Sequence, residues 1–341
     1  MRQYIAEVIV GLEQFAVQEL KQHLNKKGSL RIQYIDKGEI TFETDASLKT
    51  LHLLRSVQSI SRRLTLDVPR PKALLGNQQM GWILEDAQEI LKEGRGSFKT
   101  LSIAAAGSES SVMQRIKQEL SQRLSLQPAE TGDFVVRIRP NPSNRGGWQV
   151  LMRTTPRPLA TRTWRNQNFE GALNATIAYT MIQILFKTGA KGNILNLGSG
   201  SGTFLAEFGT SSTANEIWGL EIDPLLIDLS RKNLTHKQQT RLIQGDFRKI
   251  PLGSGSIDAL ISDLPFGQKV GTHQENLKLY PKILEEAYRM SRASGKFLFI
   301  THEIKLISAL LRGNDRWHLE AEYPVVQRGL HPHIYLLGKN D

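Results

Sequence analysis

Apolar and polar residues alternate at the start of the chain, and this alternation then gives way to helical spacing. Alternation predicts a strand buried on one side, whereas apolar residues three and four positions apart predict an amphipathic helix. The predicted elements are a strand at 4–10, a helix at 12–24, strands at 30–34 and 39–43, a helix at 46–54 and a strand at 59–66. This β-α-β-β-α-β order is typical of a ferredoxin-like domain, which we place at residues 1–68.

A second block of strands and helices comes after the stretch Val68-Pro69-Arg70-Pro71, which we interpret as a linker. The predicted elements are helices at 81–91 and 111–124 and strands at 97–104, 134–139 and 148–153. Arg137 and Arg139 alternate with apolar residues, so both arginines lie on one face of their strand. That face is either a contact surface for a polyanion or an ordinary solvated face. We assign this block to residues 69–153.

From residue 172 onward, apolar strands alternate regularly with helices. Strands are predicted at 193–197, 216–221, 241–244, 257–262, 296–301, 317–323 and 334–338, and helices at 174–186, 202–208, 224–233, 275–291 and 304–311. This order indicates an open, doubly wound α/β sheet of about seven strands, closed by a hairpin. Residues 154–175 are then a linker, and residues 176–341 form a Rossmann-like domain.

The amino-acid composition excludes several classes of protein and of functional site. The 341 residues contain no cysteine, which excludes disulfides, thiolate metal sites and cysteine nucleophiles. The eight histidines show no ligand spacing, so we expect no metal site. No stretch approaches the ~20 apolar residues of a spanning helix, so we expect no membrane contact and a soluble, cytoplasmic protein.

The net charge of +11 is unevenly distributed. Residues 1–165 hold 25 Lys and Arg against 16 Asp and Glu, whereas residues 166–341 hold 19 against 17. A basic half beside a near-neutral half favours a module that binds a polyanion, although a basic surface that only maintains solubility also explains it. Arginines surround Trp164 between the two halves, a combination that suits phosphate contact with base stacking; the alternative is a connecting segment held against the neighbouring domain. These arginines are Arg153, Arg157, Arg162 and Arg165.

The strand at 193–197 runs into three alternating glycines, Gly198, Gly200 and Gly202. Ser199 lies between the first two, and Thr203 comes directly after the third. Glycine permits a sharp turn and the close approach of a ligand. The segment lacks the later third glycine of a nicotinamide-binding turn, the Gly-Lys-Ser/Thr of a P-loop and the pattern of a nucleophile elbow. The G-x-G-x-G form is common in proteins that bind S-adenosylmethionine, and an ordinary glycine turn is the alternative.

Acidic residues stand at the ends of the next two strands. Glu221 comes about 20 residues after the glycines, where a carboxylate can bond both ribose hydroxyls of a nucleotide. Ile222 is the next residue, and Asp223 is better placed to cap the next helix. Further along, Asp246 can accept an adenine amino group, and Phe247 can cover the ring.

The segment Asp263-Leu264-Pro265-Phe266 comes directly after the apolar strand at 257–262. An exocyclic amine on a nucleobase is a poor nucleophile because its lone pair is delocalised into the ring. The Asp263 side chain and the carbonyl of Leu264 or Pro265 can accept both N–H bonds, which frees the lone pair to attack a sulfonium methyl. Phe266 offers a stacking face for a flipped base, and Asp263 can take the proton. The alternative is an ordinary strand-ending turn.

These four motifs, in this order, resemble the class I S-adenosylmethionine methyltransferases that act on amino groups, whose signature is [D/N/S]-P-P-[Y/F/W]. Leu264 replaces the first proline, which loosens the turn but keeps both acceptors and the ring. Residues 11–13, 171–178 and the surroundings of Trp164 look like those of THUMP-containing RNA methyltransferases. Among these, the chain is most similar to the tRNA guanine-N2 methyltransferases of the acceptor stem.

The resemblance implies a ferredoxin-like domain, a THUMP domain that docks the tRNA acceptor end, and a catalytic domain that uses S-adenosylmethionine; we expect a monomer. It implies catalytic roles for Asp263, Pro265 and Phe266. The implied cofactor-binding residues are Asn174, Thr176, Gly198, Ser199, Gly200, Gly202, Thr203, Glu221, Ile222, Asp246, Phe247 and Asp263. The implied RNA-binding residues are Arg137, Arg139, Arg153, Arg157, Arg162, Trp164 and Arg165.

Three other functions remain open at this point. A ribosomal RNA guanine-N2 or a DNA adenine-N6 methyltransferase would use the same amine-binding turn. An RNA-binding protein with a vestigial cofactor fold is disfavoured by the presence of Asp263 and Glu221. A nicotinamide oxidoreductase is disfavoured because Thr203 stands where its third glycine would be.

Overall fold

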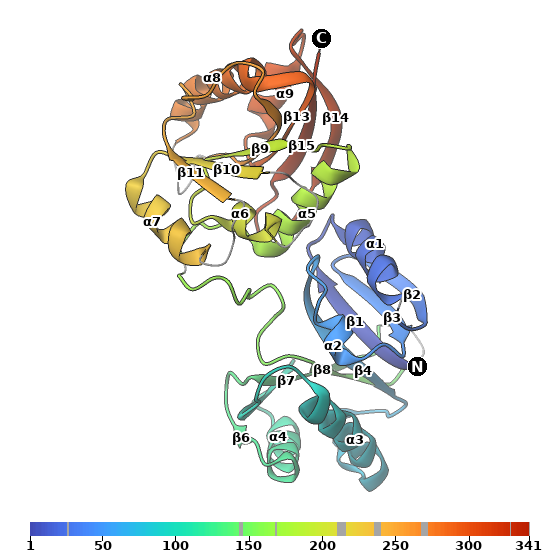
Figure 1. The fold of residues 1–341 in the computed structure, drawn as a ribbon. Helices are drawn as coiled ribbons and strands as arrows, with labels where there is room; N and C mark the ends of the chain where they lie inside the picture. The colour runs from blue at the N-terminus through green and yellow to red at the C-terminus, as the bar shows by residue number, and fades with distance from the viewer. Residues whose placement is uncertain are drawn as a thin grey trace. The chain divides into compact units, whose positions relative to one another are not determined.

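The computed structural model describes residues 1–25, 27–142, 146–167, 169–209, 216–234, 240–266, 272–327 and 329–340 (Figure 1). The chain divides into two compact units. Unit 1 comprises Met1–Val8 and Glu13–Ala160, and unit 2 comprises Ile9–Leu12 and Thr161–Asp341.

Unit 1 is built on one eight-stranded sheet with the strand order β2-β3-β1-β4-β8-β7-β5-β6. Its first four strands and first two helices have the predicted β-α-β-β-α-β order, and β4 pairs antiparallel with β8 of the second block. The strands are β1 (Arg2–Val8), β2 (Leu30–Asp36), β3 (Glu39–Thr44), β4 (Val57–Leu66), β5 (Thr100–Ala105), β6 (Gln127–Pro128), β7 (Phe134–Pro140) and β8 (Trp148–Arg153). The helices are α1 (Glu13–Leu24), α2 (Leu48–Leu51), the 3₁₀ helix η1 (Pro71–Leu75), α3 (Asn77–Glu93) and α4 (Ser111–Leu124).

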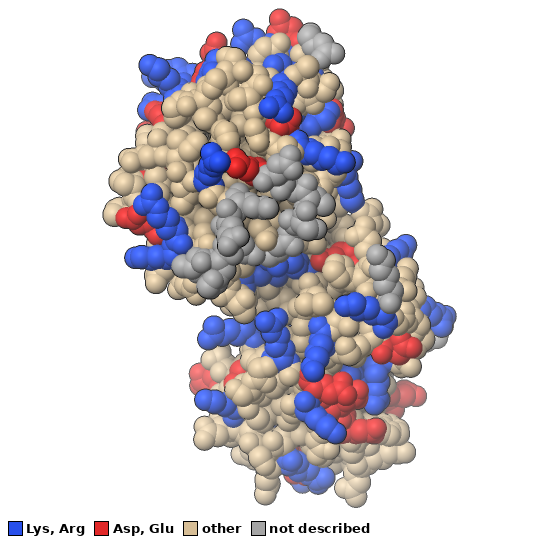
Figure 2. Space-filling model, viewed as in Figure 1, with Lys and Arg blue, Asp and Glu red and all other residues tan. Residues whose placement is uncertain are grey.

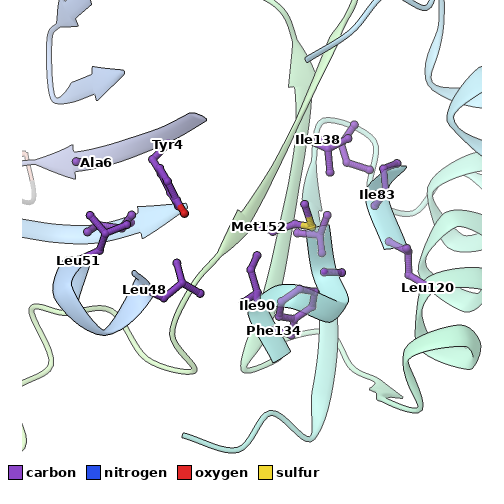
Figure 3. Packing of buried hydrophobic residues seen from close by; sticks show 14 of the residues in the cluster. Tyr4, Ala6, Leu48, Leu51, Ile83, Ile90, Leu120, Phe134, Ile138 and Met152 are labelled. Atoms are coloured by element: carbon purple, nitrogen blue, oxygen red, sulfur yellow. The ribbon is translucent and has the colours of Figure 1, made fainter. Parts of the chain in front are cut away.

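The core of unit 1 forms because the apolar faces of its helices cover the sheet. Ile83 and Ile90 of α3 and Leu120 of α4 pack with Phe134 and Met152 from the strands (Figure 3). All five are nearly inaccessible to solvent. Burying such a side chain contributes about 1.5–3 kcal/mol, so this layer stabilises the unit strongly.

Two predicted segments of unit 1 differ from the structure. Helix α2 covers only Leu48–Leu51 of the predicted 46–54 because its first turn is capped by Ser47, whose hydroxyl accepts a hydrogen bond from the Thr50 N–H at 3.3 Å. The stretch interpreted as a linker runs directly into η1, where Leu74 is fully buried. The proline pattern did not reveal this packing.

Unit 2 contains the predicted seven-stranded sheet, with the order β11-β10-β9-β12-β13-β15-β14. The first five strands pair in parallel, and β15 pairs antiparallel with β13 and β14, which is the predicted closing hairpin. The strands are β9 (Asn193–Leu197), β10 (Glu216–Glu221), β11 (Thr240–Gln244), β12 (Ile257–Asp263), β13 (Ser291–Thr301), β14 (Trp317–Pro324) and β15 (His333–Lys339).

Helices cover both faces of this sheet, with α5, α6 and α7 on one side and α8 and α9 on the other (Figure 1). They are α5 (Ala175–Lys187), α6 (Thr203–Phe208), α7 (Pro224–Asn233), α8 (His273–Met290) and α9 (Ile304–Leu311). Because both faces are covered, the central parallel strands β9 and β12 are buried along most of their length. None of the helices in the described part of the chain has the length and apolar character needed to cross a membrane.

Candidate active site

Three strand ends meet at the carboxyl edge of the unit 2 sheet. Leu197 of β9 pairs with Leu220 of β10 on one side and with Ser262 of β12 on the other. The residues next in the chain after these three lie beside one another at this edge, at the ~4.8 Å spacing of neighbouring strands. They are Gly198, Glu221 and Asp263. In open α/β sheets, ligands bind at this edge.

The loop between β9 and α6 takes the left-handed backbone conformation at each predicted glycine. The angle φ is +64° at Gly198, +52° at Gly200 and +82° at Gly202. A Cβ on Gly202 would lie 2.4 Å from the hydroxyl oxygen of Ser230, whereas a Cβ on Gly200 would meet no atom within 4 Å. Gly202 therefore permits close packing, and Gly200 leaves the backbone open to a ligand. The buried Ser199 hydroxyl finds no hydrogen-bond partner within the described ranges, so a bound molecule could satisfy it.

Main-chain N–H groups hold the carboxylate of Glu221, which is only 7% exposed. Its Oε2 accepts a hydrogen bond from Gly200 N at 2.8 Å, and its Oε1 accepts from Ile222 N at 2.9 Å and Asp223 N at 3.1 Å. A carboxylate offers about four acceptor positions, so one remains on Oε2 beside the glycine loop. Asp223 instead caps α7 by accepting from Leu225 N at 2.8 Å, as predicted. The exposed side chain of Ile222 lies between these two acids in the chain.

Phe247 and Asp246 come shortly after β11 and have different surroundings. The Cε1 atom of Phe247 lies 3.6 Å from the position of a Cβ on Gly198, so this ring lies against the glycine loop. Asp246 forms an ion pair with Arg248, whose hydrogen bonds hold the pKa of Asp246 below its usual value. Phe247 is therefore placed to cover a ring at the loop, whereas Asp246 would have to share its carboxylate with Arg248.

Two of the three polar residues at the starts of α5 and α6 have side-chain partners within the chain. Asn174 Oδ1 caps α5 by accepting from Thr176 N at 2.8 Å. The Thr176 hydroxyl is buried and finds no partner among the residues that the structure describes. Thr203 Oγ1 accepts from Arg165 Nη2 at 3.1 Å. These contacts explain local structure, and cofactor contacts by these residues remain predictions.

Asp263, the last residue of β12, differs from Glu221 in having no such support. Within the described ranges, no side chain or main-chain group forms a hydrogen bond with its carboxylate. Burial raises the pKa of Asp263 to about 7, because a charged carboxylate is poorly solvated there. An unpaired carboxylate at a ligand-binding edge is available to a substrate group.

The three residues after Asp263 are fixed in position. Leu264 is 3% exposed, and its N–H donates to the Ile300 carbonyl at 3.1 Å. A proline could not donate this bond, so the leucine anchors the turn where we had expected loosening. The Phe266 ring packs edge-on against His302 with ring centroids 4.9 Å apart, and desolvation lowers the pKa of His302. Across the described residues, no group of three or more His, Asp and Glu side chains is arranged to hold a metal ion.

Two side chains for which the sequence predicted no role bind the carbonyl of Pro265. Asn276 Nδ2 donates to it at 3.0 Å, and Tyr280 Oη donates at 2.7 Å. Both residues belong to α8, and their spacing of four places them on one helix face. That spacing was visible in the sequence, but nothing in the sequence indicated that this face meets the Asp263 turn.

The arginines predicted to bind RNA in β7 already have acidic partners. Arg137 forms an ion pair with Glu7, and Arg139 forms a two-bond pair with Glu39 at 2.8 and 2.7 Å. Figure 2 shows Lys and Arg side chains on the visible face of unit 1 together with Asp and Glu side chains. The β7 arginines would therefore have to exchange or share these partners to contact phosphate.

Arg153 and Arg157 differ although they are close in sequence. Arg153 donates to the carbonyls of Asp133, Thr155 and Pro156 at 2.7–2.9 Å, and its burial lowers its pKa. Arg157 is exposed. Of these two arginines, Arg157 is the better candidate for a phosphate contact.

The predicted RNA contacts around Trp164 are mostly engaged within unit 2. Arg162 Nε and Trp164 Nε1 both donate to Oε1 of the fully buried Glu207, at 3.0 and 2.9 Å. The guanidinium of Arg165 lies 5.0 Å from the Trp164 ring and also bonds Thr203. If Arg162 turned to contact a phosphate, the buried Glu207 carboxylate would lose this partner, which would cost several kcal/mol of free energy, about 3–5 kcal/mol for a typical buried pair. These contacts agree with the alternative of a connecting segment held against the neighbouring domain, and RNA contacts by these residues remain predictions.

The part of the chain that forms this site matches a known family. The family described as "RMKL-like, methyltransferase domain" matches residues 162–333, which is half of the chain. A tRNA (guanine(6)-N(2))-methyltransferase, THUMP3, from Bos taurus is 34% identical over 99 residues, covering 28% of this chain and 20% of that protein. A tRNA (guanine(6)-N2)-methyltransferase from Methanocaldococcus jannaschii is 24% identical over 125 residues, covering 36% and 32%. The chain thus matches about a fifth to a third of the length of these curated relatives.

The fold is also that of a solved structure. TrmN from Thermus thermophilus superimposes with a TM-score of 0.75 over 100% of both chains, at 18% sequence identity. The predicted α/β fold class, with a Rossmann-like sheet, is confirmed by this similarity and by the strand order of unit 2.

Proposed function

The chain belongs to the RMKL-like methyltransferase domain family, and we propose that it methylates the exocyclic N2 amine of a guanosine in tRNA, with S-adenosylmethionine as methyl donor. The observation that carries this proposal is the unpaired carboxylate of Asp263, a residue whose strand ends beside the start of the glycine loop. The names of the curated relatives support tRNA and guanine N2, which the fold alone does not select. We place the nucleotide in the acceptor stem, as the resemblance implies.

The glycine loop fits the proposed cofactor. Gly200 leaves the backbone open, Ser199 offers an unsatisfied hydroxyl, and Glu221 has an acceptor position left for a ribose hydroxyl. When bound, S-adenosylmethionine supplies a methyl group on a positively charged sulfur. The other residues that we propose for this site are Asn174, Thr176, Gly198, Gly202, Thr203, Ile222, Asp246 and Phe247.

We propose that the Asp263 carboxylate and the Leu264 carbonyl accept the two N–H bonds of the guanine amine. The Pro265 carbonyl already accepts from two side chains of α8, which uses both of its lone pairs and favours Leu264 among the alternatives that the sequence left open. Holding the amine in this way draws its nitrogen toward tetrahedral geometry, and orientation alone can supply ~7–11 kcal/mol. Phe266 would stack on the base.

The proton leaves through the same carboxylate. Methyl transfer from the sulfonium would leave S-adenosylhomocysteine and an amine that carries one proton too many, which makes it acidic. Asp263 accepts that proton, and its pKa of about 7 lets it release the proton to water afterwards. No other base is required.

We propose that unit 1 supplies RNA contacts, with residues 69–153 as the THUMP-like part, and that the protein acts as a cytoplasmic monomer. Residues 1–165 carry most of the positive charge, which supports phosphate contact. Arg157 is the exposed candidate, and Arg137 and Arg139 would exchange acidic partners for phosphates.

The test incubates the protein with labelled S-adenosylmethionine and, separately, with tRNA, ribosomal RNA and DNA, and identifies the modified nucleoside. We expect N2-methylguanosine in tRNA. Label in ribosomal RNA or DNA alone would establish one of the competing substrates, and no label in any of them would contradict an enzymatic role. Mapping the nucleotide then tests the acceptor-stem assignment.

A further inference from the structure

Four residues form a ring of hydrogen bonds with the carbonyl of Pro265, which closes through the main-chain N–H and the side chain of Glu303, and we name these four the carbonyl clamp. Asn276 Nδ2 and Tyr280 Oη donate to this carbonyl at 3.0 and 2.7 Å. Tyr280 Oη lies 2.6 Å from Thr301 Oγ1, which accepts from the N–H of Glu303 at 3.0 Å. Asn276 Nδ2 also donates to Glu303 Oε1 at 3.0 Å, which closes the ring.

The chemistry of these groups permits only one direction for each bond. Tyr280 has a single hydroxyl proton, which goes to the carbonyl, so the Thr301 hydroxyl must donate to Tyr280. The Asn276 amide must present its nitrogen, because its oxygen would face two other acceptors. Asn276 Oδ1 itself is buried and finds no partner in the described part of the chain. The two hydrogen bonds that Nδ2 donates, to the Pro265 carbonyl and to Glu303, outweigh the cost of this unsatisfied oxygen.

Burial makes this arrangement rigid. Asn276 and Thr301 are 0% exposed, and Tyr280 is 1% exposed. Burial also raises the pKa of Tyr280, so its hydroxyl remains a donor across the physiological pH range. Water therefore has little access to Asn276, Tyr280 and Thr301, whereas Glu303 is partly exposed and also bonds His273.

We propose that the carbonyl clamp positions the Leu264 carbonyl toward the substrate amine, an inference that rests on the proposed function. The Leu264 N–H is bonded to Ile300, and the next carbonyl, that of Pro265, is held by the clamp. The Leu264 carbonyl lies between these two anchors, so its direction is set by both. Without the clamp, the Pro265 carbonyl also becomes a competing acceptor for the amine. The clamp residues are thus positioning residues that do not touch the substrate.

The sharpest test is Tyr280→Phe, which removes one hydroxyl and keeps the ring in the core. We expect kcat to fall about tenfold or more, because misplacing a reacting group by ~1 Å costs up to about 100-fold. The KM for tRNA and the Kd for S-adenosylhomocysteine should stay within about twofold of wild type. Thr301→Val, which removes both the support of Tyr280 and the acceptor of the Glu303 N–H, should lower kcat in the same way but less. In the double variant, Thr301→Val should add little to Tyr280→Phe, because both break the same arm of the ring.

Tyr288→Phe is the matched control, since Tyr288 lies two turns further along α8 and packs against Trp317. It should leave kcat unchanged. Each variant is also measured by thermal unfolding, and its activity is assayed well below its unfolding midpoint.

A kcat for Tyr280→Phe within twofold of wild type would overturn the inference. So would a loss of kcat that parallels the loss of cofactor affinity, or one that recovers fully at lower temperature, because either would indicate a merely structural role. A wild-type protein that methylates no nucleic acid contradicts the proposed function instead. The two failures are therefore told apart by the wild-type assay.

Discussion

Glu221 and Asp263 are two acidic residues at the same edge of one sheet, and their surroundings are opposite. Glu221 accepts three main-chain hydrogen bonds, at 2.8–3.1 Å. Asp263 receives none from the described residues, and burial raises its pKa to about 7. A carboxylate satisfied by the main chain is suited to holding a ligand in a fixed place. One that lacks partners is suited to accepting N–H bonds and a proton from a substrate.

Sequence position alone does not determine the role of an acidic residue at a strand end. The difference arises from the direction of the main-chain N–H groups in the turn after each strand. After β10 the chain turns so that the N–H groups of Ile222 and Asp223 point back at Glu221, whereas after β12 the N–H of Leu264 is directed to β13. The turn at Asp263 has no main-chain donor directed at the carboxylate among the described residues.

The largest effect that we expect is from Asp263→Ala. Methyl transfer should fall by about 1,000-fold or more, because the variant loses both an amine acceptor and the proton acceptor. The Kd for S-adenosylhomocysteine should stay within a few fold, since the glycine loop and Glu221 are unchanged. Calorimetric binding together with a single-turnover assay checks both. Activity near that of wild type would contradict the mechanism.

The reciprocal change is Glu221→Ala, which should act on cofactor binding. We expect the Kd to rise about 10–100-fold, because the variant loses the ribose contact and the bond that holds Gly200. At saturating cofactor, kcat should recover to within about threefold of wild type. If kcat fell as far as in Asp263→Ala while binding stayed intact, the division of labour between the two acids would be wrong.

A smaller effect is expected from pH. The deprotonated form of Asp263 is the acceptor, so kcat/KM should rise through about pH 7 and then level off, by about tenfold between about pH 6 and pH 8. Asp263→Asn keeps an acceptor oxygen that does not titrate, so its lower activity should not change across this range. A midpoint near pH 4, or the same profile in the asparagine variant, would show that another group titrates.

Much of unit 2 was predictable because its central strands are mostly apolar and its ligand-binding residues stand at or directly after the ends of these strands. The glycine loop, Glu221 and Asp263 all belong to one edge for that reason. Asp223 was also predictable as a cap, since capping depends only on the next turn of helix.

The residues that sequence reasoning missed depend on contacts between distant segments. Tyr280 and Asn276 meet Pro265 only because α8 packs back over the end of β12. Arg162 is paired with Glu207, which lies 45 residues away, and no pattern in the sequence indicated this internal partner. The hydrogen bond from the Leu264 N–H to Ile300 could not be predicted from the sequence. Every residue except proline has a main-chain N–H, so its presence at Leu264 gave no signal.

The smallest expected effect comes from Asp223→Ala, which separates the two acids that the sequence places two residues apart. Asp223 caps α7, so its loss should lower the free energy of unfolding by about 1 kcal/mol. The Kd for S-adenosylhomocysteine should change less than twofold, because the carboxylate beside the glycine loop is that of Glu221. Urea unfolding and calorimetric binding measure the two quantities independently. A tenfold loss of affinity for S-adenosylhomocysteine with an unchanged free energy of unfolding would show that Asp223, and not Glu221, makes the ribose contact. The contrast between Glu221 and Asp263 would then be wrong.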